Sequence, residues 1–510
     1  MATSPTRRYR VLIIGAGISG IAAACQLKEK LGVVDLLVLE QQDGLGGTWW
    51  NHRYPGVACD VPASLYSYSF ARNPAWSTFK PSGSEIQRYL MQVCEKFQIT
   101  GNIQFRSTVT TLEWSDTQHE WTVTVLTRNG QQKIRAKIVI TAVGKFDVPD
   151  LSILDGLEGR DAFKGTICHS AQWDDSVEPR GQNVTVIGGG CSAVQIVGEL
   201  INSNNIGDRA SSVTQLIRSP HWVAPSHLSD WALTKWERYM PFVMQSIPGL
   251  TWIVRLLIFI ITELTYLLYV WAHPACDYLR RRREHRLIKH LHSASPKEYG
   301  EILTPSYPVG CKRVINDTGW LDCLHSRQLQ LYNLAIKRLE ERAVILQQES
   351  QEIRVPTDIL ILATGYQHNT LLQSLRITGQ DGIDLHQMWQ DKGGPQAYLT
   401  LAVDQFPNLF MLYGPNTSNG HTSVIIGIEN TIGYIVRLAR PILKGHILAV
   451  QPKEAARIHW TQKVQSASRN SVWVSGGCSN WYIDEEGWNA MAYPYVLNLS
   501  LQSYSCIPLY

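Results

Sequence analysis

Three side chains stand out by type and by neighbourhood, namely Asp60, His169 and Arg313. An arginine stays protonated and offers several hydrogen-bond donors, so Arg313 could stabilise negative charge that develops on a substrate. A histidine in a loop could act as a general base near neutral pH. On residue type alone, Asp60 is more simply explained as the cap of a turn, and Arg313 as a phosphate contact or a surface ion pair. The surrounding elements must decide between these roles.

A glycine-rich turn near the N-terminus predicts a dinucleotide site. A short apolar run ends at GAGISG, so that Gly15, Gly17 and Gly20 fit the G-x-G-x-x-G spacing between a strand and a helix. The first glycine permits the tight turn, the second lets a pyrophosphate approach the backbone, and the third lets helix and strand pack closely. A second apolar run ends at Glu40, 20 residues after Gly20, which suits a carboxylate that accepts from a ribose hydroxyl. A signal peptide, which the basic and apolar N-terminus imitates, does not explain this order of elements.

The same unit recurs further along the chain. The sequence NVTVIGGGCSA has a G-x-G-x-x-A spacing, and the strand after the next helix ends in Arg218 and Ser219 instead of an acid. An arginine there suits the 2′-phosphate of NADPH, which a carboxylate would repel. A solvated strand end is the alternative explanation of Arg218. The residues expected to bind NADPH at this turn are Gly188, Gly189, Gly190, Cys191, Ser192, Ala193, Val194 and Gln195.

Two dinucleotide units predict an α/β protein with two Rossmann-like domains, one for FAD and one for NADPH. The apolar segments IVITAVG and DILILATGY also end in glycine turns, as expected where the chain passes between a flavin domain and an inserted NADPH domain. We expect an FAD-binding domain of residues 1–148 and 365–510, an NADPH-binding domain of residues 149–225 and 300–364, and a helical insertion of residues 226–299 in the NADPH domain.

The composition is that of a folded protein with a large core. Of 510 residues, 44% are hydrophobic and 18% are charged. A net charge of +4 does not favour nucleic-acid binding. The ten cysteines include no C-x-x-C pair and no zinc pattern, so we expect free thiols, no metal site and a cytoplasmic location.

The apolar stretch of residues 253–272 raises the question of a membrane. Its 20 residues are long enough to span a bilayer, but Arg255 and Glu263 within it would be costly in hydrocarbon. A helix packed on the protein, with a membrane-surface contact through residues 253–283, is more economical than a span that would split the NADPH domain. Such a helix could also shape the entry for a lipophilic substrate. A buried helix, a surface helix and a span all stay open at this point.

Two further segments carry a family resemblance. The sequence GGTW, then YPG, then Asp60 resembles the flavin domain of class B flavoprotein monooxygenases. The stretch FKGTICHSAQWDD, residues 163–175, fits F-x-G-x-x-x-H-x-x-x-W-[PD], which is typical of Baeyer–Villiger monooxygenases, and the resemblance runs from Val11 to about Pro494. It implies an FAD- and NADPH-dependent enzyme that converts a small-molecule ketone to an ester or lactone with O₂, through a peroxide on the flavin C4a carbon.

The resemblance also assigns roles that residue type left open. The segment YPVGCKRVINDTGW resembles the one that presents the active-site arginine, so Arg313 is its match, and Lys312 matches a contact to the 2′-phosphate of NADPH. Asp60 matches the aspartate that positions this arginine, whereas His169 matches a structural residue near the domain linker. The further cofactor contacts expected are Glu40, Thr48, Trp49, Trp50, Asn51, Ala58, Cys59, Tyr66, Val109, Val424 and, near the nicotinamide ribose, Trp481.

Three other functions fit parts of the sequence. A flavin monooxygenase that oxygenates nitrogen or sulfur is the alternative, although that subgroup tends to have Asn in place of Asp60 and lacks the arginine segment. An NADPH–disulfide oxidoreductase needs two neighbouring cysteines beside the flavin, where this chain has Trp49 and Trp50. A catalytically silent, membrane-associated binding protein would not require Asp60 and Arg313.

Overall fold

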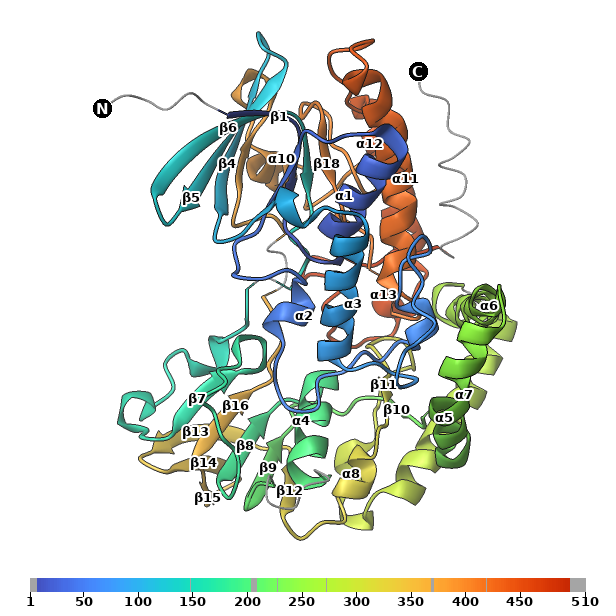
Figure 1. Ribbon diagram of the computed structural model, residues 1–510. Coiled ribbons are helices and arrows are strands. Elements are labelled where there is room, and N and C mark those ends of the chain that lie inside the picture. Colours follow the sequence, from blue (N-terminus) through green and yellow to red (C-terminus); the bar gives the residue numbers. More distant parts are fainter. Residues whose placement is uncertain are drawn as a thin grey trace.

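Two sheets, one toward each end of the molecule, form its framework (Figure 1). The computed structural model describes residues 7–146, 148–202, 209–226, 228–271, 273–367, 371–418 and 420–495. The first sheet has the strand order β17-β4-β5-β6-β1-β2-β3, with β18 beside β6. Its strands are β1 (Arg7–Ile14), β2 (Leu36–Leu39), β3 (Ile103–Gln104), β4 (Thr108–Ser115), β5 (Glu120–Thr127), β6 (Gly130–Thr141), β17 (Arg376–Thr378) and β18 (Leu409–Met411).

The second half of β1, residues 11–14, is buried on both faces of the sheet, which is why its sequence is a continuous apolar run. Val11 and Ile13 belong to one hydrophobic cluster, and Leu12 and Ile14 belong to another on the opposite face. Helices therefore cover the sheet on both sides. The helices of the first cluster are α1 (Ile18–Leu31), α3 (Gly83–Lys96), α11 (Val424–Leu443) and α12 (Glu454–Arg469), and the second cluster includes α10 (Leu385–Asp391).

The second sheet is parallel throughout, in the order β12-β9-β8-β16-β7. One face packs against α4 (Cys191–Asn202) and α9 (Trp320–Cys323), and the other packs against a three-stranded antiparallel sheet. The parallel strands are β7 (Thr166–His169), β8 (Asn183–Ile187), β9 (Ser212–Leu216), β12 (Leu329–Tyr332) and β16 (Ile359–Leu362), and the antiparallel ones are β13 (Ala335–Glu340), β14 (Ala343–Gln348) and β15 (Gln351–Pro356). The predicted α/β class with two dinucleotide-type units is confirmed.

The two strand-to-helix turns have the same backbone geometry. Gly15, between β1 and α1, has φ of 105°, and a Cβ there would lie 2.6 Å from the carbonyl oxygen of Ala142. Gly188, between β8 and α4, has φ of 141°, and its Cβ would lie 2.5 Å from the carbonyl oxygen of Ala363. Only glycine fits such a turn, because the backbone is in the left-handed region and a neighbouring strand end is in contact.

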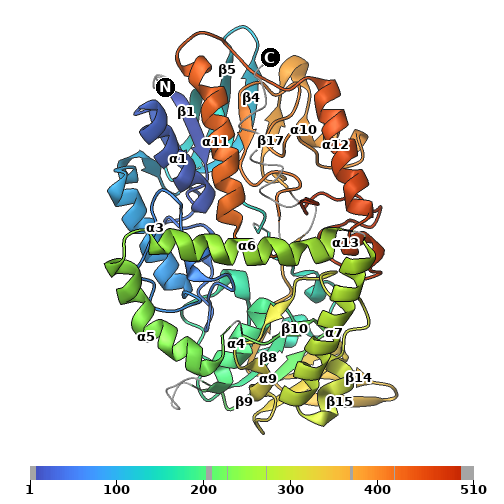
Figure 2. The ribbon, with the colours of Figure 1, turned by 90° about the vertical axis from the view of Figure 1, so that its right-hand side faces the viewer.

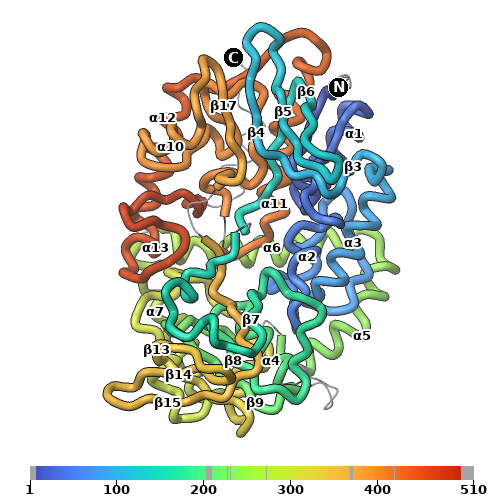
Figure 3. The backbone as a smooth tube through the Cα atoms, turned by 90° about the vertical axis from the view of Figure 1, so that its left-hand side faces the viewer, coloured from blue at the N-terminus to red at the C-terminus, as the bar shows by residue number. Residues whose placement is uncertain are grey.

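The chain passes twice between the two sheets, and the two passages run side by side (Figure 3). The first follows β6 and the second follows β16. Backbone hydrogen bonds join them, from Gln367 N–H to the carbonyl oxygen of Val148 at 2.9 Å and from Asp150 N–H to that of Gly365 at 3.0 Å. The residues that connect the sheets are thus those of the two glycine turns noted in the sequence.

Three helices form the insertion, and the middle one crosses one side of the molecule, at a level between the two sheets (Figures 1 and 2). They are α5 (Asp230–Ser246), α6 (Leu250–Val270) and α7 (Pro274–Ala294). Helix α6 covers most of the predicted apolar stretch, although Ala272 lies outside the described residues. The remaining short elements are α2 (Thr48–Asn51), α8 (Gly300–Leu303), α13 (Val472–Ser475) and the paired strands β10 (Val223–Ala224) and β11 (Ile315–Asn316).

The expectation that all cysteines are free thiols is wrong for one pair. Cys311 and Cys478 form a disulfide, although they lie 167 residues apart in the chain. The fold brings them together in a cluster that also contains Tyr269 of α6 and Trp473 of α13. Spacing in the sequence cannot reveal such a pair, because a disulfide depends on the distance between Cα atoms in the folded chain. Free cysteines in the described residues are Cys25, Cys59, Cys94, Cys168, Cys191, Cys276 and Cys323.

Candidate active site

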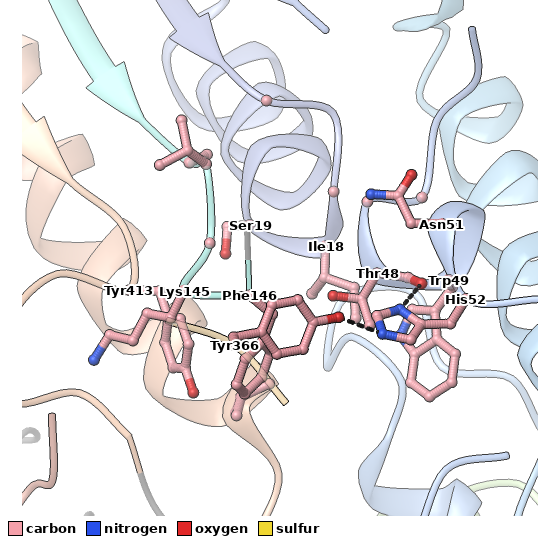
Figure 4. A pocket seen from close by; sticks show the side chains of 18 of the residues that line it. Ile18, Ser19, Thr48, Trp49, Asn51, His52, Lys145, Phe146, Tyr366 and Tyr413 are labelled. Atoms are coloured by element: carbon pink, nitrogen blue, oxygen red, sulfur yellow. Dashed lines mark hydrogen bonds between the residues drawn. The ribbon is translucent and has the colours of Figure 1, made fainter. Parts of the chain in front are cut away.

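A cavity of about 460 Å³ lies where the first nucleotide turn, α2, the end of β6 and the start of α4 meet. Figure 4 shows side chains around it, among them Ser19, Trp49, Lys145 and Phe146 from these elements, and Tyr413, which follows β18. This position is at the carboxyl ends of parallel strands, where open α/β sheets bind their ligands. The predicted residues that line it are Gly15, Gly17, Glu40, Thr48, Trp49, Asn51, Ala58, Cys59, Asp60, Tyr66, Val109, Cys191, Ser192, Gln195, Arg313, Val424 and Trp481.

The first nucleotide turn fits the FAD that the sequence predicts. The N-terminus of α1 has no side-chain cap, so its free N–H groups can bind a pyrophosphate. Glu40 is held in the cavity wall by two backbone donors, Ala16 N–H at 2.7 Å from Oε2 and Gln42 N–H at 2.8 Å from Oε1. Each carboxylate oxygen has a second lone pair, with which it can accept from a ribose hydroxyl.

The two tryptophans of helix α2 have different environments. Trp49 lines the cavity, and its indole N–H donates to the hydroxyl of Tyr66 at 3.1 Å. Trp50 is not among the described residues of the cavity wall, because it packs against Gly44 and lies 4.5 Å below the guanidinium of Arg53. Trp49 and Tyr66 can therefore wall a flat ring, whereas the cofactor contact of Trp50 stays a prediction.

Arg313 and Asp60 form the ion pair that the resemblance implied. Arg313 Nε donates to Oδ2 at 3.0 Å, and Nη2 lies 2.8 Å from Oδ1 and 2.7 Å from Oδ2. Both side chains line the cavity, and 36% of the arginine side chain remains exposed. The carboxylate raises the pKa of Arg313 further above its ordinary value. Burial opposes ionisation of Asp60, but the Arg313 guanidinium outweighs it and lowers the pKa of that carboxyl, so the pair is charged across the neutral range.

Several elements fix the segment that carries Arg313. Gly310 has φ of 94° and packs against the ring of Tyr269, where a Cβ would lie 2.3 Å from a ring carbon. The disulfide of Cys311 attaches the segment to the C-terminal region, and β11 begins at Ile315 and pairs with β10. The helical insertion thus helps to position the arginine, through the inner face of α6.

Three predicted contacts of the 2′-phosphate gather beside the second sheet. Lys312 Nζ donates to the hydroxyl of Ser219 at 2.9 Å. Burial lowers the pKa of Lys312, and the positive charge of Arg218 lowers it further. Two cations that repel each other in one place fit a site for a multivalent anion. His221 adds a buried Nδ1 atom without a hydrogen-bond partner beside this group, and burial and Lys312 lower its pKa to about 4.

The second nucleotide turn lies outside the cavity. The predicted residues that are absent from the described cavity wall are Gly20, Trp50, Gly188, Gly189, Gly190, Ala193, Val194, Arg218, Ser219 and Lys312. The cavity reaches only the first turn of α4, at Cys191, Ser192 and Gln195. The structure therefore separates a flavin-type cavity from a neighbouring anion site, and the adjacent residues Arg313 and Lys312 belong to the cavity wall and to the anion site respectively.

His169 has a structural environment. It ends β7, and its backbone pairs with Leu362 of β16. Its Nδ1 accepts from Ala171 N–H at 3.1 Å, and its ring lies 6.2 Å from that of Tyr366, on the second passage between the sheets. His169 is not among the described residues of the cavity wall. This placement supports the structural role that the resemblance implied over that of a general base.

Sequence reasoning missed many residues of the cavity wall, among them His52, Lys145, Phe146, Tyr366 and Tyr413. The hydroxyl of Tyr366 lies 2.5 Å from His52 Nε2, and this contact joins α2 to the second passage between the sheets. One signal was available for Lys145 and Phe146, because they directly follow a glycine turn at the carboxyl end of a predicted strand.

Part of the chain matches a family model. The match covers residues 12–238, and the family is described as pyridine nucleotide-disulphide oxidoreductase. This range includes both nucleotide turns. Cys311 and Cys478 lie outside it, so the match does not supply the flavin-side cysteine pair that an enzyme acting on disulfides needs.

Curated relatives match over almost the whole chain. The Baeyer-Villiger monooxygenase of Streptomyces coelicolor is 31% identical over 490 residues, which are 95% of this chain and 88% of that protein. The FAD-binding monooxygenase ktnD of Aspergillus niger is 33% identical over 493 residues, 94% of this chain and 77% of that protein.

Solved structures share the fold at lower identity. An oxidized steroid monooxygenase bound to NADP has a TM-score of 0.80 at 22% identity, and the alignment covers 98% of this chain and 97% of that one. A cyclohexanone monooxygenase from Rhodococcus sp. Phi1 bound to NADP⁺ has the same TM-score of 0.80, identity of 22% and coverage of 98% and 97%.

Proposed function

Because the chain belongs to the Baeyer–Villiger monooxygenases, FAD- and NADPH-dependent enzymes that convert a ketone to an ester or lactone with O₂, we propose that Arg313 and Asp60 are its catalytic pair. The observation that carries this proposal is the two-pronged ion pair in the wall of the cavity. The substrate is a small molecule that enters this cavity together with O₂.

FAD held at the first nucleotide turn would supply the acceptance of hydride from NADPH and the activation of O₂. The protein must then stabilise negative charge that develops on the oxygen and on the ketone adduct. Arg313 suits this role because it stays protonated and keeps donors free on the cavity side, and a preorganised charge of this kind is commonly a large catalytic term. Asp60 holds the guanidinium in place, so little reorganisation is needed when the substrate charge appears.

The cofactor sites are proposed in two groups. FAD contacts the first nucleotide turn, Glu40 and the wall formed by Trp49 and Tyr66, and NADPH contacts the second turn with its 2′-phosphate at Arg218 and Lys312. The free N-terminus of α1 and the cations around Lys312 support this division. The proposed domain boundaries are those expected from the sequence, since the strands of the second sheet all fall between the two chain passages.

The test is the variant Arg313→Ala, with Arg313→Lys beside it. Ester formation from a ketone panel should fall roughly 10²- to 10³-fold in Arg313→Ala, the cost of losing one charge-stabilising donor. Arg128→Ala, which removes an exposed arginine that is not among the described residues of the cavity wall, is the matched control. An Arg313→Ala enzyme that retains FAD and makes ester at the wild-type rate would refute the catalytic role.

We further propose that the enzyme works in the cytoplasm and touches a membrane surface through its helical insertion. Within the described residues, α6 is the one helix whose length and composition would allow it to cross a membrane. Its charged residues face the protein. Arg255 donates to the carbonyl oxygen of Ser67 at 2.6 Å, and Glu263 contacts His421 at 3.0 Å. A membrane span would have to break these contacts, so a helix lying on the protein is favoured.

The outer side of α6 is apolar instead. Ile261 is 63% exposed, Leu264 is 60% exposed and Leu257 is 55% exposed. We call this the outer face, and its residues are Trp252, Ile253, Leu256, Leu257, Ile260, Ile261 and Leu264. The neighbouring helices carry exposed cations, at Lys235 and Arg238 of α5 and at Arg281, Arg282 and Arg286 of α7. An apolar face between cations suits an anionic lipid surface, from which a lipophilic ketone could be supplied.

Vesicle flotation tests the membrane contact. The FAD-loaded enzyme should float with phosphatidylcholine vesicles that contain phosphatidylglycerol, and the double variant Leu257→Glu/Ile261→Glu should bind them at least about tenfold less. Leu448→Glu, an equally exposed leucine far from α6, is the control. Flotation that is unchanged in the double variant, or a wild-type enzyme that does not float, would refute the contact.

A further inference from the structure

Lys145 is a buried lysine in the wall of the cavity. It follows the glycine turn after β6, and only 7% of the residue is exposed (Figure 4). Its Nζ donates to the hydroxyl of Ser418 at 3.2 Å and lies 3.5 Å from the carbonyl oxygen of Met491, and it lies 4.7 Å from the centre of the Tyr413 ring. Within the part of the chain that the structure describes, it forms no ion pair with a carboxylate.

The other charges of the cavity wall have protein partners. Arg313 is compensated by Asp60, and both oxygens of Glu40 accept backbone N–H groups. Lys145 has only neutral neighbours, and burial lowers its pKa to about 7. A lysine in such a place is unfavourable for packing alone, because an uncompensated buried charge costs more than an apolar side chain of the same length.

The position of Lys145 relative to Arg313 suggests its use. Tyr413 contacts the Lys145 ammonium with the face of its ring, and its hydroxyl oxygen accepts a hydrogen bond from Ser418. Burial raises the pKa of Tyr413, and the positive charge of Arg313 opposes this rise. Tyr413 therefore lies close to Lys145 and within the electrostatic reach of Arg313. Lys145 and Arg313 both line the cavity, so a substrate whose carbonyl lies at Arg313 can extend a substituent toward Lys145.

We propose that Lys145, in the cavity wall, forms a subsite for an anionic substituent of the ketone, a carboxylate above all. This subsite rests on the proposed function, since the ketone carbonyl is placed at Arg313. The ammonium of Lys145 can donate charge-assisted hydrogen bonds to a carboxylate, whose negative charge supplies the ionic partner that Lys145 lacks. The enzyme should thus prefer keto acids over neutral ketones of the same shape.

Matched ketones test the subsite. The probes are 4-oxocyclohexanecarboxylate and 4-acetylbenzoate, each compared with its primary amide. Binding to the FAD-loaded enzyme is followed by the flavin absorption spectrum, and turnover is followed by ester formation. We expect the wild-type enzyme to favour each acid over its amide by at least about tenfold in Kd or KM, the worth of one charge-assisted hydrogen bond.

The variant Lys145→Met should reduce this acid-to-amide ratio to about one, and Lys145→Arg should retain most of it. Lys145→Gln provides a second neutral variant if Lys145→Met does not fold. An equal affinity of the wild-type enzyme for acid and amide, or a ratio that Lys145→Met leaves unchanged, would overturn the proposal. The binding ratio is measured without turnover, so a failure of the catalytic proposal for Arg313 would appear separately, as ester formation that persists in Arg313→Ala.

Discussion

The two nucleotide turns of this chain have the same backbone and opposite charges. Gly15 and Gly188 both have positive φ, and each contacts the end of a neighbouring strand. The strand after the first turn leads to Glu40, whereas the strand after the second leads to Arg218, beside Lys312. We expect the shared backbone to bind a pyrophosphate in each unit, and the charge at the end of the second strand to select the dinucleotide.

The third position of each pattern shows a second difference. A Cβ at Gly20 would lie 1.9 Å from the carbonyl oxygen of Gly15, so helix α1 approaches its own turn too closely for any other residue. In the second unit Ala193 occupies the corresponding place and is fully buried. The first turn is therefore the less tolerant of the two.

The largest expected effect comes from exchanging these third residues. Gly20→Ala should abolish FAD binding, because the clash is with backbone and cannot be relieved by a side-chain movement. Ala193→Gly should leave FAD binding intact and cost about 1 kcal/mol of unfolding free energy, the helix propensity of alanine over glycine. The FAD-to-protein ratio and the urea midpoint measure the two effects. A yellow Gly20→Ala enzyme would contradict the comparison.

The next effect concerns the choice of nicotinamide cofactor. The double variant Arg218→Ala/Lys312→Ala should lower kcat/KM for NADPH roughly 10²- to 10³-fold, since two charge-assisted contacts to the 2′-phosphate are lost. The value for NADH should change far less, because NADH has no such phosphate. Stopped-flow reduction of the flavin by each cofactor gives both constants. If both cofactors lost activity equally, the cations would have another role.

A smaller effect is expected at the acid of the first unit. Glu40→Gln should raise the Kd for FAD roughly tenfold, because the neutral amide keeps one acceptor but loses the charge-assisted bonds. The ratio of NADPH to NADH activity should stay the same in the reconstituted variant. Fluorescence titration of the apoenzyme with FAD measures the first quantity. A Glu40→Gln variant that binds FAD with the wild-type Kd would contradict the proposed contact between Glu40 and the ribose.

The smallest expected effect is on pH dependence. Burial and Arg218 lower the pKa of Lys312, so this lysine loses its proton at a lower pH than a free lysine does. Only the protonated form attracts the 2′-phosphate, so KM for NADPH should rise several-fold as pH increases through that pKa. KM for NADH should be flat over the same range. In Arg218→Ala the rise should move to higher pH, which distinguishes Lys312 from other titrating groups.

The features that the sequence predicted correctly are local. Each glycine turn lies within one short segment, together with the charged residue at the end of its second strand. The ion pair between Asp60 and Arg313 joins distant parts of the chain, but each residue was predicted from the short segment around it. The side-chain directions of the adjacent Trp49 and Trp50 were harder to predict, because they depend on a helix of only four residues.

The features that the sequence missed depend on tertiary contacts. Lys145 contacts Ser418 and Met491, which lie more than 270 residues away in the chain, so no local pattern predicts these contacts. The apolar stretch was recognised, but which side of α6 carries its charges follows from the positions of Ser67 and His421. When a helix carries both charged and apolar residues, the elements that pack against it decide which side faces the protein.

The disulfide has a consequence for motion. Cys311 is two residues before Arg313, and Cys478 is three residues before Trp481, so one covalent bond ties both cavity-wall segments together. While the bond is intact, the loop of Trp481 cannot swing away alone, because its displacement pulls the arginine segment with it. If substrate enters or ester leaves past this part of the wall, the Arg313 segment and the Trp481 loop therefore have to move together.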